Sequence, residues 1–152
     1  MNDNPIEVKI ENKEVEKALL EIAKRTENLR PLMKNIAGIL AYSTEENFKN
    51  EGRPDKWADL ADITKKKREK INKWPGQILQ VEGQLASSVN TQYDNNSAVI
   101  GSNKEYAAIH QFGGNAGRNK KVKIPARPYL QLTDEDFEEI MYECRKYLFD
   151  ND

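Results

Sequence analysis

Hydrophobic and polar positions in the first fifty residues follow two different periods, which predict a strand and then helices. The stretch IEVKI, residues 6–10, alternates apolar and charged side chains, as a strand with one buried face does. From residue 13 onward, apolar side chains recur every three or four positions, which is the spacing of one helical face. Pro31 suits the first turn of a second helix, and Gly52 permits the left-handed conformation that ends a helix. Residues 1–51 are therefore expected to form a strand plus a long or broken helical arm, with an apolar stripe at Val15, Leu19, Ile22, Thr26, Leu32, Ile36, Ile39, Leu40 and Phe48.

Residues 52–76 change to a polar segment, which predicts a loop followed by a basic helix. The proline and the polar residues favour turns, and the few large apolar side chains are the points that hold such a loop on a core. The expected features, in order, are a turn at Pro54-Asp55, core anchors at Trp57 and Leu60, a helix over residues 63–72 that packs lightly through Ile63 and Ile71, and a stop at Pro75-Gly76.

Residues 78–130 predict short β-strands with one short helix between them. Paired glycines end helices, and prolines stiffen the backbone around them. The expected elements, in order, are strands at Leu85–Tyr93 and Ala98–Gly101 joined by a turn at residues 94–96, a helix over KEYAAIHQF (residues 104–112) ended by Gly113-Gly114, a mobile polar loop at residues 114–121, a strand at Val122–Ile124, and the stiff segment PARPYL.

The last segment has the clearest pattern of a helix. Thr133 is a good N-cap, and three acidic residues follow it at the positive end of the helix. The coarse order of elements predicts an α+β fold, in which a small antiparallel sheet is packed by the long N-terminal helical arm and the C-terminal helix. One domain is expected over residues 1–152. The apolar face of the last helix comprises Phe137, Ile140, Met141, Cys144 and Leu148.

Composition excludes several classes of protein. The chain has 152 residues, one cysteine and a formal net charge of −1. A disulfide framework within one chain is therefore excluded, and the whole protein exerts no net attraction on nucleic acid. No apolar run reaches the roughly 18 residues that span a bilayer, and the N-terminus lacks the pattern of a signal peptide. A soluble intracellular protein without membrane partners is expected.

Charge is distributed in blocks of alternating sign. Residues 53–73 carry a net charge of +4 and residues 115–129 carry +5, whereas residues 130–152 carry −6. Blocks of this kind allow like subunits to dock against each other. The alternative is that they are solvated faces and loops, because charge patterning alone does not locate an interface.

The single histidine, His110, is the one candidate for a catalytic base. The nearest partners by type are Ser87, Ser88, Ser102 and Glu105, and none lies in a nucleophile motif. On a short helix, His110 and Tyr106 share a face at a spacing of four residues. Packing beside Tyr106 is therefore favoured over catalysis.

No cofactor or metal site is predicted. One histidine and one distant cysteine do not form a zinc site, and the acidic residues near the C-terminus lack calcium-loop spacing. The glycines after His110 match neither nucleotide-binding motif. Cys144 falls on an apolar helix face, so it is expected to pack as a small hydrophobe.

Two basic segments, residues 65–73 and 118–123, make DNA binding the alternative function, because lysine and arginine can contact phosphates. No aromatic residues for base stacking are interleaved with these charges. A solvated surface or a contact with an acidic neighbour is therefore favoured for both segments.

Four stretches occur in a characteristic order: WADLADIT (57–64), ILQVEGQLASSV (78–89), IGSNKEYAAIHQFGG (100–114) and IPARPYLQLTDED (124–136). Taken together, they resemble the phage virion morphogenesis family, the Mu-like tail-completion proteins. The resemblance runs from about Gly52 to Leu148. Two departures are a short loop after Gly114 and Val81-Glu82 in place of a small hydroxyl residue before a glycine.

This resemblance implies a structural protein of a phage or prophage, with no enzyme activity and no cofactor. It implies action in tail completion or head–tail joining, as an oligomer, with other tail or connector proteins as partners. The expected locations are the host cytoplasm during assembly and the virion tail. The motif residues expected to pack are Trp57, Leu60, Thr64, Gly83, Leu85, Tyr106, His110, Phe112, Gly113 and Gly114.

A contact between subunits is expected to use the basic loop on one side and the acidic last helix on the other. Arg127 lies between prolines, on a rigid backbone, and is expected to form a bidentate bond to a carboxylate of the same or the next chain. The residues predicted for this contact are Arg118, Lys120, Lys121 and Arg127.

Overall fold

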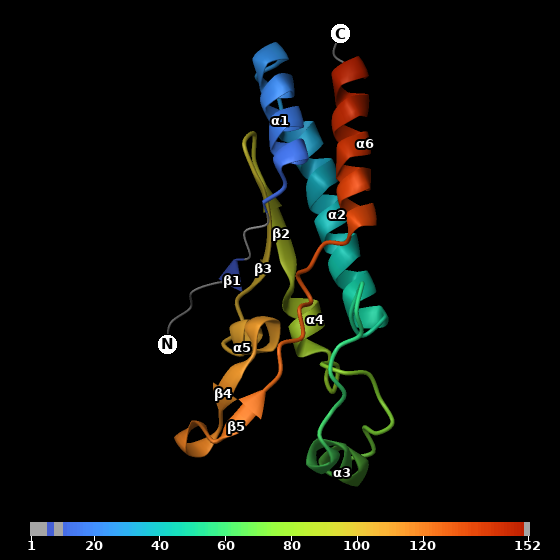
Figure 1. Ribbon diagram of the computed structural model, residues 1–152, viewed down its shortest axis with the longest axis vertical. Helices are drawn as coiled ribbons and strands as arrows, with labels where there is room; N and C mark the ends of the chain where they lie inside the picture. Colours follow the sequence, from blue (N-terminus) through green and yellow to red (C-terminus); the bar gives the residue numbers. More distant parts are fainter. Residues whose placement is uncertain (1–5, 8–10, 151–152) are drawn as a thin grey trace.

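Three helices lie side by side and form one end of the molecule, the upper end in Figure 1. The computed structural model describes residues 6–7 and 11–150. The predicted helical arm is present and is broken at residues 26–29, between its two helices. The C-terminal helix packs against both parts of the arm. The three helices are α1 (Lys13–Arg25), α2 (Arg30–Lys49) and α6 (Asp134–Asp150).

A three-stranded antiparallel sheet lies beside α2, in the strand order β1–β3–β2. Ile6 of β1 is opposite Ser102, and Thr91 of β2 is opposite Ile100. Of the strand predicted at residues 6–10, the first two residues are confirmed, and the other three lie outside the described residues. The α+β class is therefore confirmed. The strands are β1 (Ile6–Glu7), β2 (Asn90–Tyr93) and β3 (Ala98–Ser102).

The turn between β2 and β3 has a second role, because it caps α2. Within the turn, Asp94 Oδ1 accepts hydrogen bonds from two backbone N–H groups at 2.7 and 2.8 Å. Asn95 Oδ1 accepts hydrogen bonds from the N–H groups of Leu29 and Arg30 at 2.8 and 3.1 Å. Since the first N–H groups of a helix lack intrahelical acceptors, this side chain supplies the missing cap from another part of the chain.

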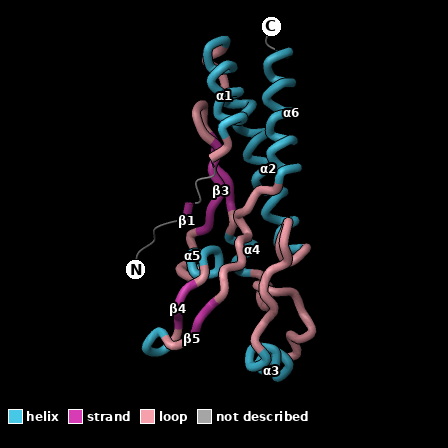
Figure 2. Tube along the Cα trace, viewed as in Figure 1, coloured by secondary structure: helices cyan, strands magenta, loops and turns pink. Residues whose placement is uncertain are grey.

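Smaller elements form the other end of the molecule (Figures 1 and 2). Residues 114–121, predicted to be a loop without regular structure, instead form one strand and the turn of a hairpin, with a 3-10 turn at Arg118–Lys120. Gly117, at φ +76°, and Asn119, at φ +60°, supply the positive φ angles that this tight reversal needs. The elements here are α3 (Asp62–Lys70), α4 (Gln84–Ser88), α5 (Ala107–Phe112), β4 (Gly114–Ala116) and β5 (Val122–Ile124).

Two expectations from the apolar pattern are wrong. The strand expected over Leu85–Tyr93 begins only at Asn90, and the residues before it form α4. Gly83, at φ +68°, turns the backbone into this helix, and Leu85 is then buried as a helical side chain. In α3 the expected apolar contacts are absent, since Ile63 is 65% exposed and Ile71, just after the helix, is 56% exposed.

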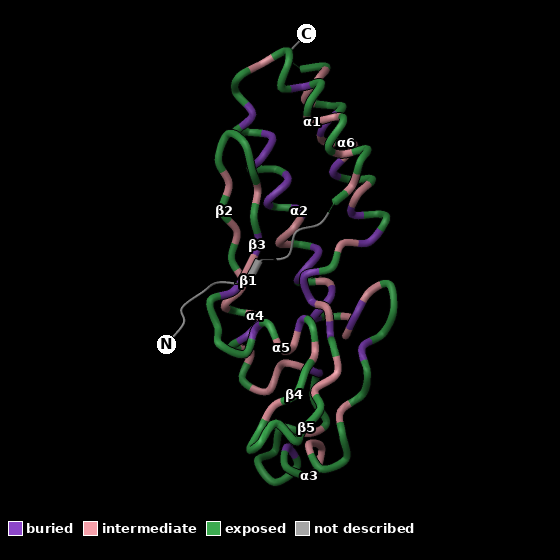
Figure 3. Tube along the Cα trace, turned by 60° about the vertical axis from the view of Figure 1, so that its left-hand side comes forward, coloured by how far each residue is buried: buried purple, intermediate pink, exposed green. Residues whose placement is uncertain are grey.

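Two hydrophobic clusters form the core. Buried positions follow α2 along most of its length (Figure 3), and Leu40 of this helix contacts both clusters. One cluster joins the three long helices, and the other joins the end of α2 to the small elements. Their buried members are Ile22, Leu29, Leu32, Met33, Ile36, Ile39, Ile140 and Cys144 in the first, and Phe48, Trp57, Ile78, Leu85, Ile100, Ala107, Tyr129 and Leu130 in the second.

A buried polar network joins α2 to the start of α6. Asp136 Oδ2 accepts hydrogen bonds from Ser43 Oγ at 2.6 Å and from the backbone N–H of Thr133 at 2.9 Å. Thr133 Oγ1 in turn accepts from the N–H of Asp136, which confirms the predicted N-cap. Asn47 donates to two backbone carbonyl groups of the PARPYLQ segment. This network holds the segment 125–131 between the two helices.

Candidate functional site

A groove between α3 and β5 contains most of the motif residues that the sequence predicts. Its volume is about 480 Å³. α4 and α5 close it from behind, since Leu85 and His110 line it from these helices. Large apolar side chains form much of its wall: Leu60, Ile63, Leu79, Val81, Leu85, Val122, Ile124 and Pro125.

The wall is built by two motifs that interlock, EYAAIHQFGG and IPARPYL. The N–H of Arg127 donates to the carbonyl oxygen of His110 at 2.8 Å. Gln111 Oε1 accepts hydrogen bonds from the N–H groups of Tyr129 and Leu130, both at 3.0 Å. The phenol of Tyr129 donates to the Ala107 carbonyl oxygen at 2.8 Å. These bonds hold the two motifs against each other.

Gly113 is required where these motifs meet. Its φ is +73°, and a Cβ atom on this residue would lie 2.7 Å from the N atom of Ala126 and 2.9 Å from the carbonyl oxygen of Ile124. Both atoms belong to the backbone, so neither can move aside cheaply. The glycine therefore allows the end of α5 to approach the IPARPYL segment.

Arg127 is buried, and it holds the WADLADIT loop against this wall. Its Nε and Nη2 atoms donate to the carbonyl oxygens of Ala58 and Asp59, both at 2.9 Å. Only 6% of the residue is exposed. The partners thus differ from the predicted carboxylate, because two backbone carbonyl groups of the chain itself occupy the guanidinium. Burial lowers the pKa of Arg127, as does the charge of Arg68, while Asp59 raises it.

Trp57 anchors the same loop from the other side. Its indole N–H donates to the Pro128 carbonyl oxygen at 3.1 Å, and the ring packs edge-on against Phe48 at a centroid distance of 5.8 Å. The residue is 8% exposed. Leu60 and Thr64, further along the chain, are half-buried and line the groove.

His110 lies in the groove wall, with its ring edge-on to Tyr106 at a centroid distance of 6.0 Å. Burial, followed by the charge of Arg127, lowers its pKa below the ordinary value. The ring is therefore neutral at pH 7. The hydroxyl groups of Ser88 and Ser102, two of its candidate partners, pair with each other at 2.6 Å. The site offers His110 a packing role.

Two buried nitrogen atoms in this groove lack hydrogen-bond partners. Among the residues that the structure describes, the buried side-chain atoms without a partner are Arg68 Nε and His110 Nδ1. Both residues line the groove. Arg68 is only 6% exposed, and its Nη1 donates to the Gln77 carbonyl oxygen at 2.9 Å. An unpaired buried donor costs about 1–3 kcal/mol, so this wall is suited to a ligand that brings an acceptor.

Sequence analysis missed Arg68, because an arginine within a run of lysines is ordinarily exposed. Other predicted residues lie outside the groove. Phe112 was expected to pack but is 60% exposed. Gly114 begins β4. The side chains of Arg118, Lys120 and Lys121 are exposed on the hairpin turn.

The two basic segments lie at the same end of the molecule, although about fifty residues separate them in the sequence (Figure 1). Residues 62–73 and 118–123 each carry a net charge of +4. The groove lies between them. Residues 134–141, the first half of α6, carry a net charge of −5, whereas residues 142–150, at the opposite end of the molecule, carry no net charge. The negative charge of this helix therefore lies in its first half, away from the basic end.

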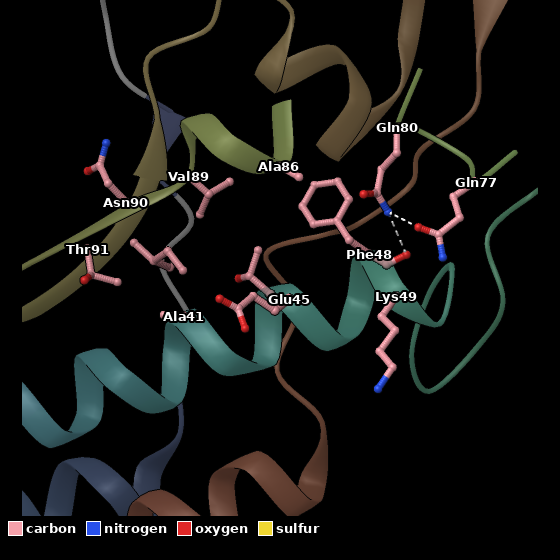
Figure 4. A pocket seen from close by; sticks show the side chains of 12 residues that line it. Ala41, Glu45, Phe48, Lys49, Gln77, Gln80, Ala86, Val89, Asn90 and Thr91 are labelled. Atoms are coloured by element: carbon pink, nitrogen blue, oxygen red, sulfur yellow. Dashed lines mark hydrogen bonds between the residues drawn. The ribbon is translucent and has the colours of Figure 1, made fainter. Parts of the chain in front are cut away.

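A second, smaller groove of about 330 Å³ lies between α2, α4 and β2 (Figure 4). Phe48, Ala86 and Val89 contribute apolar surface, while Glu45 and Lys49 extend from α2 at the edge. Gln80 Nε2 donates to Gln77 Oε1 at 2.7 Å and to the Phe48 carbonyl oxygen at 3.3 Å. This groove contains none of the predicted motif residues.

The described residues contain no cluster of three or more histidine, cysteine or acidic side chains with the geometry to hold a metal ion. None of the helices they form is long and apolar enough to cross a membrane.

The sequence profile of the phage virion morphogenesis family matches residues 10–148. The chain belongs to this family, and its role is therefore structural, in the assembly of a phage particle. The match covers α1 and α2 as well as the four motifs, so the family extends beyond the resemblance seen in the sequence.

Curated relatives agree over nearly the whole chain. The chain is 41% identical to Mu-like prophage FluMu G protein 2 of Haemophilus influenzae strain Rd over 143 residues, covering 93% of this chain and 95% of that protein. It is 35% identical to the putative capsid assembly protein G of Escherichia phage Mu, covering 91% of each. It is 32% identical to FluMu G protein 1 of the same Haemophilus strain, covering 89% of each. No solved structure matches the chain.

Proposed function

We propose that this protein completes the phage tail or joins it to the head, and that it does so as an oligomer of identical subunits. The observation that carries the proposal is the family match together with the separation of the two basic segments, at one end of the molecule, from the acidic first half of α6. An assembly protein must bind at more than one surface. A basic end and an acidic helix supply two complementary surfaces on one chain.

The partners that suit this role are other tail or connector proteins. Phage Mu protein G is described as a putative capsid assembly protein, which is compatible with action where the head and the tail meet. The protein would act in the host cytoplasm during assembly and remain in the virion tail. Neither a cofactor nor a catalytic residue has a part in this role.

DNA binding is the second candidate function, and one observation favours it. The fold brings residues 65–73 and 118–123 together at one end, which concentrates positive charge. DNA affinity that depends on phosphate contacts falls steeply with salt. Contacts between subunits with an apolar centre weaken much less, so a salt titration separates the two functions.

Deletion of the gene from an inducible phage or prophage tests the proposed function. Electron microscopy of the lysate should show heads and tails that are not joined, or tails with abnormal ends. A plasmid copy of the gene should restore infectious particles. The double charge reversal Lys120→Glu, Lys121→Glu should fail to restore them. Lys34→Glu, an exposed reversal on α2, is the control and should restore them. Normal infectious particles after deletion would contradict the proposal.

A further inference from the structure

The groove between α3 and β5 is suited to bind a ligand that has a hydrogen-bond acceptor beside a bulky apolar group. Arg68 Nε and His110 Nδ1 are buried in its wall without partners. Arg68 is more than nine-tenths buried, so solvent does not replace a partner for its Nε–H group. Native proteins pair the great majority of such atoms. Two exceptions in one groove therefore indicate an incomplete site.

The rim of this groove adds exposed apolar surface to the buried Nε–H donor of Arg68 and the unpaired Nδ1 atom of His110. Ile63 on α3 is 65% exposed and Val122 on β5 is 54% exposed, on opposite sides of the groove. Tyr106 is 37% exposed at the same groove. Positive charge surrounds them, since both basic segments lie at this end. A suitable occupant has bulky apolar side chains with carboxylates beside them.

The solvent-facing side of α6 around Tyr142 has this composition. Tyr142 is 60% exposed and Phe149 is 76% exposed. These residues are seven positions apart, so they lie on the same helix face two turns from each other. Glu138 and Glu139, one turn before Tyr142, are exposed and place carboxylates beside it, while the exposed Arg145 and Lys146 follow one turn after it. The part of α6 around residues 138–142 combines an exposed aromatic side chain with carboxylates, and it is suited to a groove that receives one helix face.

We propose that the groove of one copy binds the exposed face of α6 from a second copy. Tyr142 packs between Ile63 and Val122, and a carboxylate next to it accepts the free Nε–H of Arg68. The inference rests on the proposed oligomer and specifies its contact. The groove and the C-terminal half of α6 lie at opposite ends of the molecule (Figure 1). Each copy therefore keeps one surface of each kind free, and the contact can repeat around a ring.

Sedimentation velocity on the full-length chain, over concentrations up to about 1 mM, tests whether copies associate. Tyr142→Lys and Ile63→Glu should each weaken self-association by at least about tenfold, because each places a repelling charge in the contact. Both residues are exposed, so both variants should keep the fold. Leu20→Glu is the matched control, since Leu20 is 65% exposed on α1 and outside the contact, and it should associate like the natural chain.

A mixture of the two variants distinguishes this contact from other modes of association. Ile63→Glu keeps an intact α6, and Tyr142→Lys keeps an intact groove. Equal amounts should therefore form a one-to-one pair at concentrations where each variant alone, weakened by about tenfold, stays monomeric. Arg68→Lys keeps the charge but removes the Nε–H group, and it should weaken association by about tenfold. Its thermal unfolding, measured alongside, shows whether the fold is retained.

Three results would overturn the inference: a natural chain that stays monomeric at about 1 mM, variants that associate as the natural chain does, or a mixture that forms no pair. A fluorescein-labelled DNA duplex, bound by the natural chain and released by Lys120→Glu, Lys121→Glu without any self-association, would assign the basic end to DNA instead. The proposed function is judged separately, by the particles that form after gene deletion. If deletion of the gene prevents head–tail joining, the proposed function holds even where the contact between α6 and the groove is not found.

Discussion

Arg53, in the loop that follows α2, forms an ion pair with Asp136, in the first turn of α6. Arg53 Nη2 lies 3.2 Å from Asp136 Oδ2, and the two side chains are 20% and 7% exposed. Arg53 Nε donates at 2.9 Å to Asn47 Oδ1, and Nη2 donates at 2.9 Å to Ser43 Oγ. The pair therefore belongs to a hydrogen-bonded network rather than to an isolated surface contact, and it fixes α6 relative to α2.

Removal of the Asp136 charge should destabilise the fold. Asp136→Asn leaves the guanidinium of Arg53 without its carboxylate, and loss of one partner of a buried pair costs roughly 3 kcal/mol. Urea unfolding monitored by circular dichroism measures the free energy of unfolding. Asp134→Asn is the control, because Asp134 is an exposed acid in the same helical turn, and it should change stability by less than about 0.5 kcal/mol. Equal effects of the two substitutions would contradict this role.

The same carboxylate should make stability depend on acid pH. Burial alone would raise the pKa of Asp136, but hydrogen bonds from Ser43 and Thr133 and the charge of Arg53 lower it. A lowered folded-state pKa stabilises the native state above the unfolded value of about 3.9, and this contribution is lost as the pH falls through the folded value. Unfolding free energies measured from pH 6 downward should therefore fall less steeply for Asp136→Asn than for the natural chain. Parallel curves would show that Asp136 does not titrate in this way.

Gly113→Ala should disrupt the junction of EYAAIHQFGG with IPARPYL. The new Cβ would meet backbone atoms at 2.7 and 2.9 Å in a conformation with φ +73°. With ψ at 178°, this backbone conformation is one that essentially only glycine adopts; it alone costs an alanine about 1–3 kcal/mol, and the clash adds to this cost. We expect the free energy of unfolding to decrease by about 2 kcal/mol or more, again in urea titrations.

Gly38→Ala provides the opposite result as a control for that substitution. Gly38 lies within α2, is exposed, and has no heavy atom within 4 Å of an added Cβ. Alanine in a helix interior is more favourable than glycine by roughly 0.5–1 kcal/mol. If Gly38→Ala stabilises the protein and Gly113→Ala destabilises it, the loss comes from the backbone conformation and close contacts at Gly113 and not from the added methyl group itself. A stabilising Gly113→Ala would refute the backbone argument.

The helices with strong periodic patterns could be predicted from the sequence, because their apolar faces pack against the core. α2 and α6 lie where the spacing of apolar residues places them. α4 could not, because its five residues contain too few apolar positions to separate a helical from a strand period. In the hairpin at residues 114–124, the strand Val122–Ile124 was predicted and is β5, but β4 and the turn escaped prediction, since β4 has only three residues and the turn depends on positive φ angles.

The candidate site was predicted only in part. Leu60, Thr64, Tyr106 and His110 are motif residues that line the groove. Their convergence depends on Arg127 and Gly113, which join distant segments through backbone contacts that no spacing reveals. The exposure of Phe112 was also hidden, because its apolar character does not tell which face of a six-residue helix is buried.

Cys144 should be unreactive in the native protein and reactive after unfolding. The residue is fully buried on α6, and burial, with the charge of Glu143, raises the pKa of its thiol to about 11 against the opposing charge of Arg145. The thiolate is the reactive form, so at pH 8 native Cys144 should react with an aromatic disulfide reagent at least about a hundredfold more slowly than a free thiol. Urea-unfolded protein should release one equivalent of the aromatic thiol at the rate of glutathione. Rapid modification of the folded chain would show that the packing of α6 against α1 and α2 opens readily.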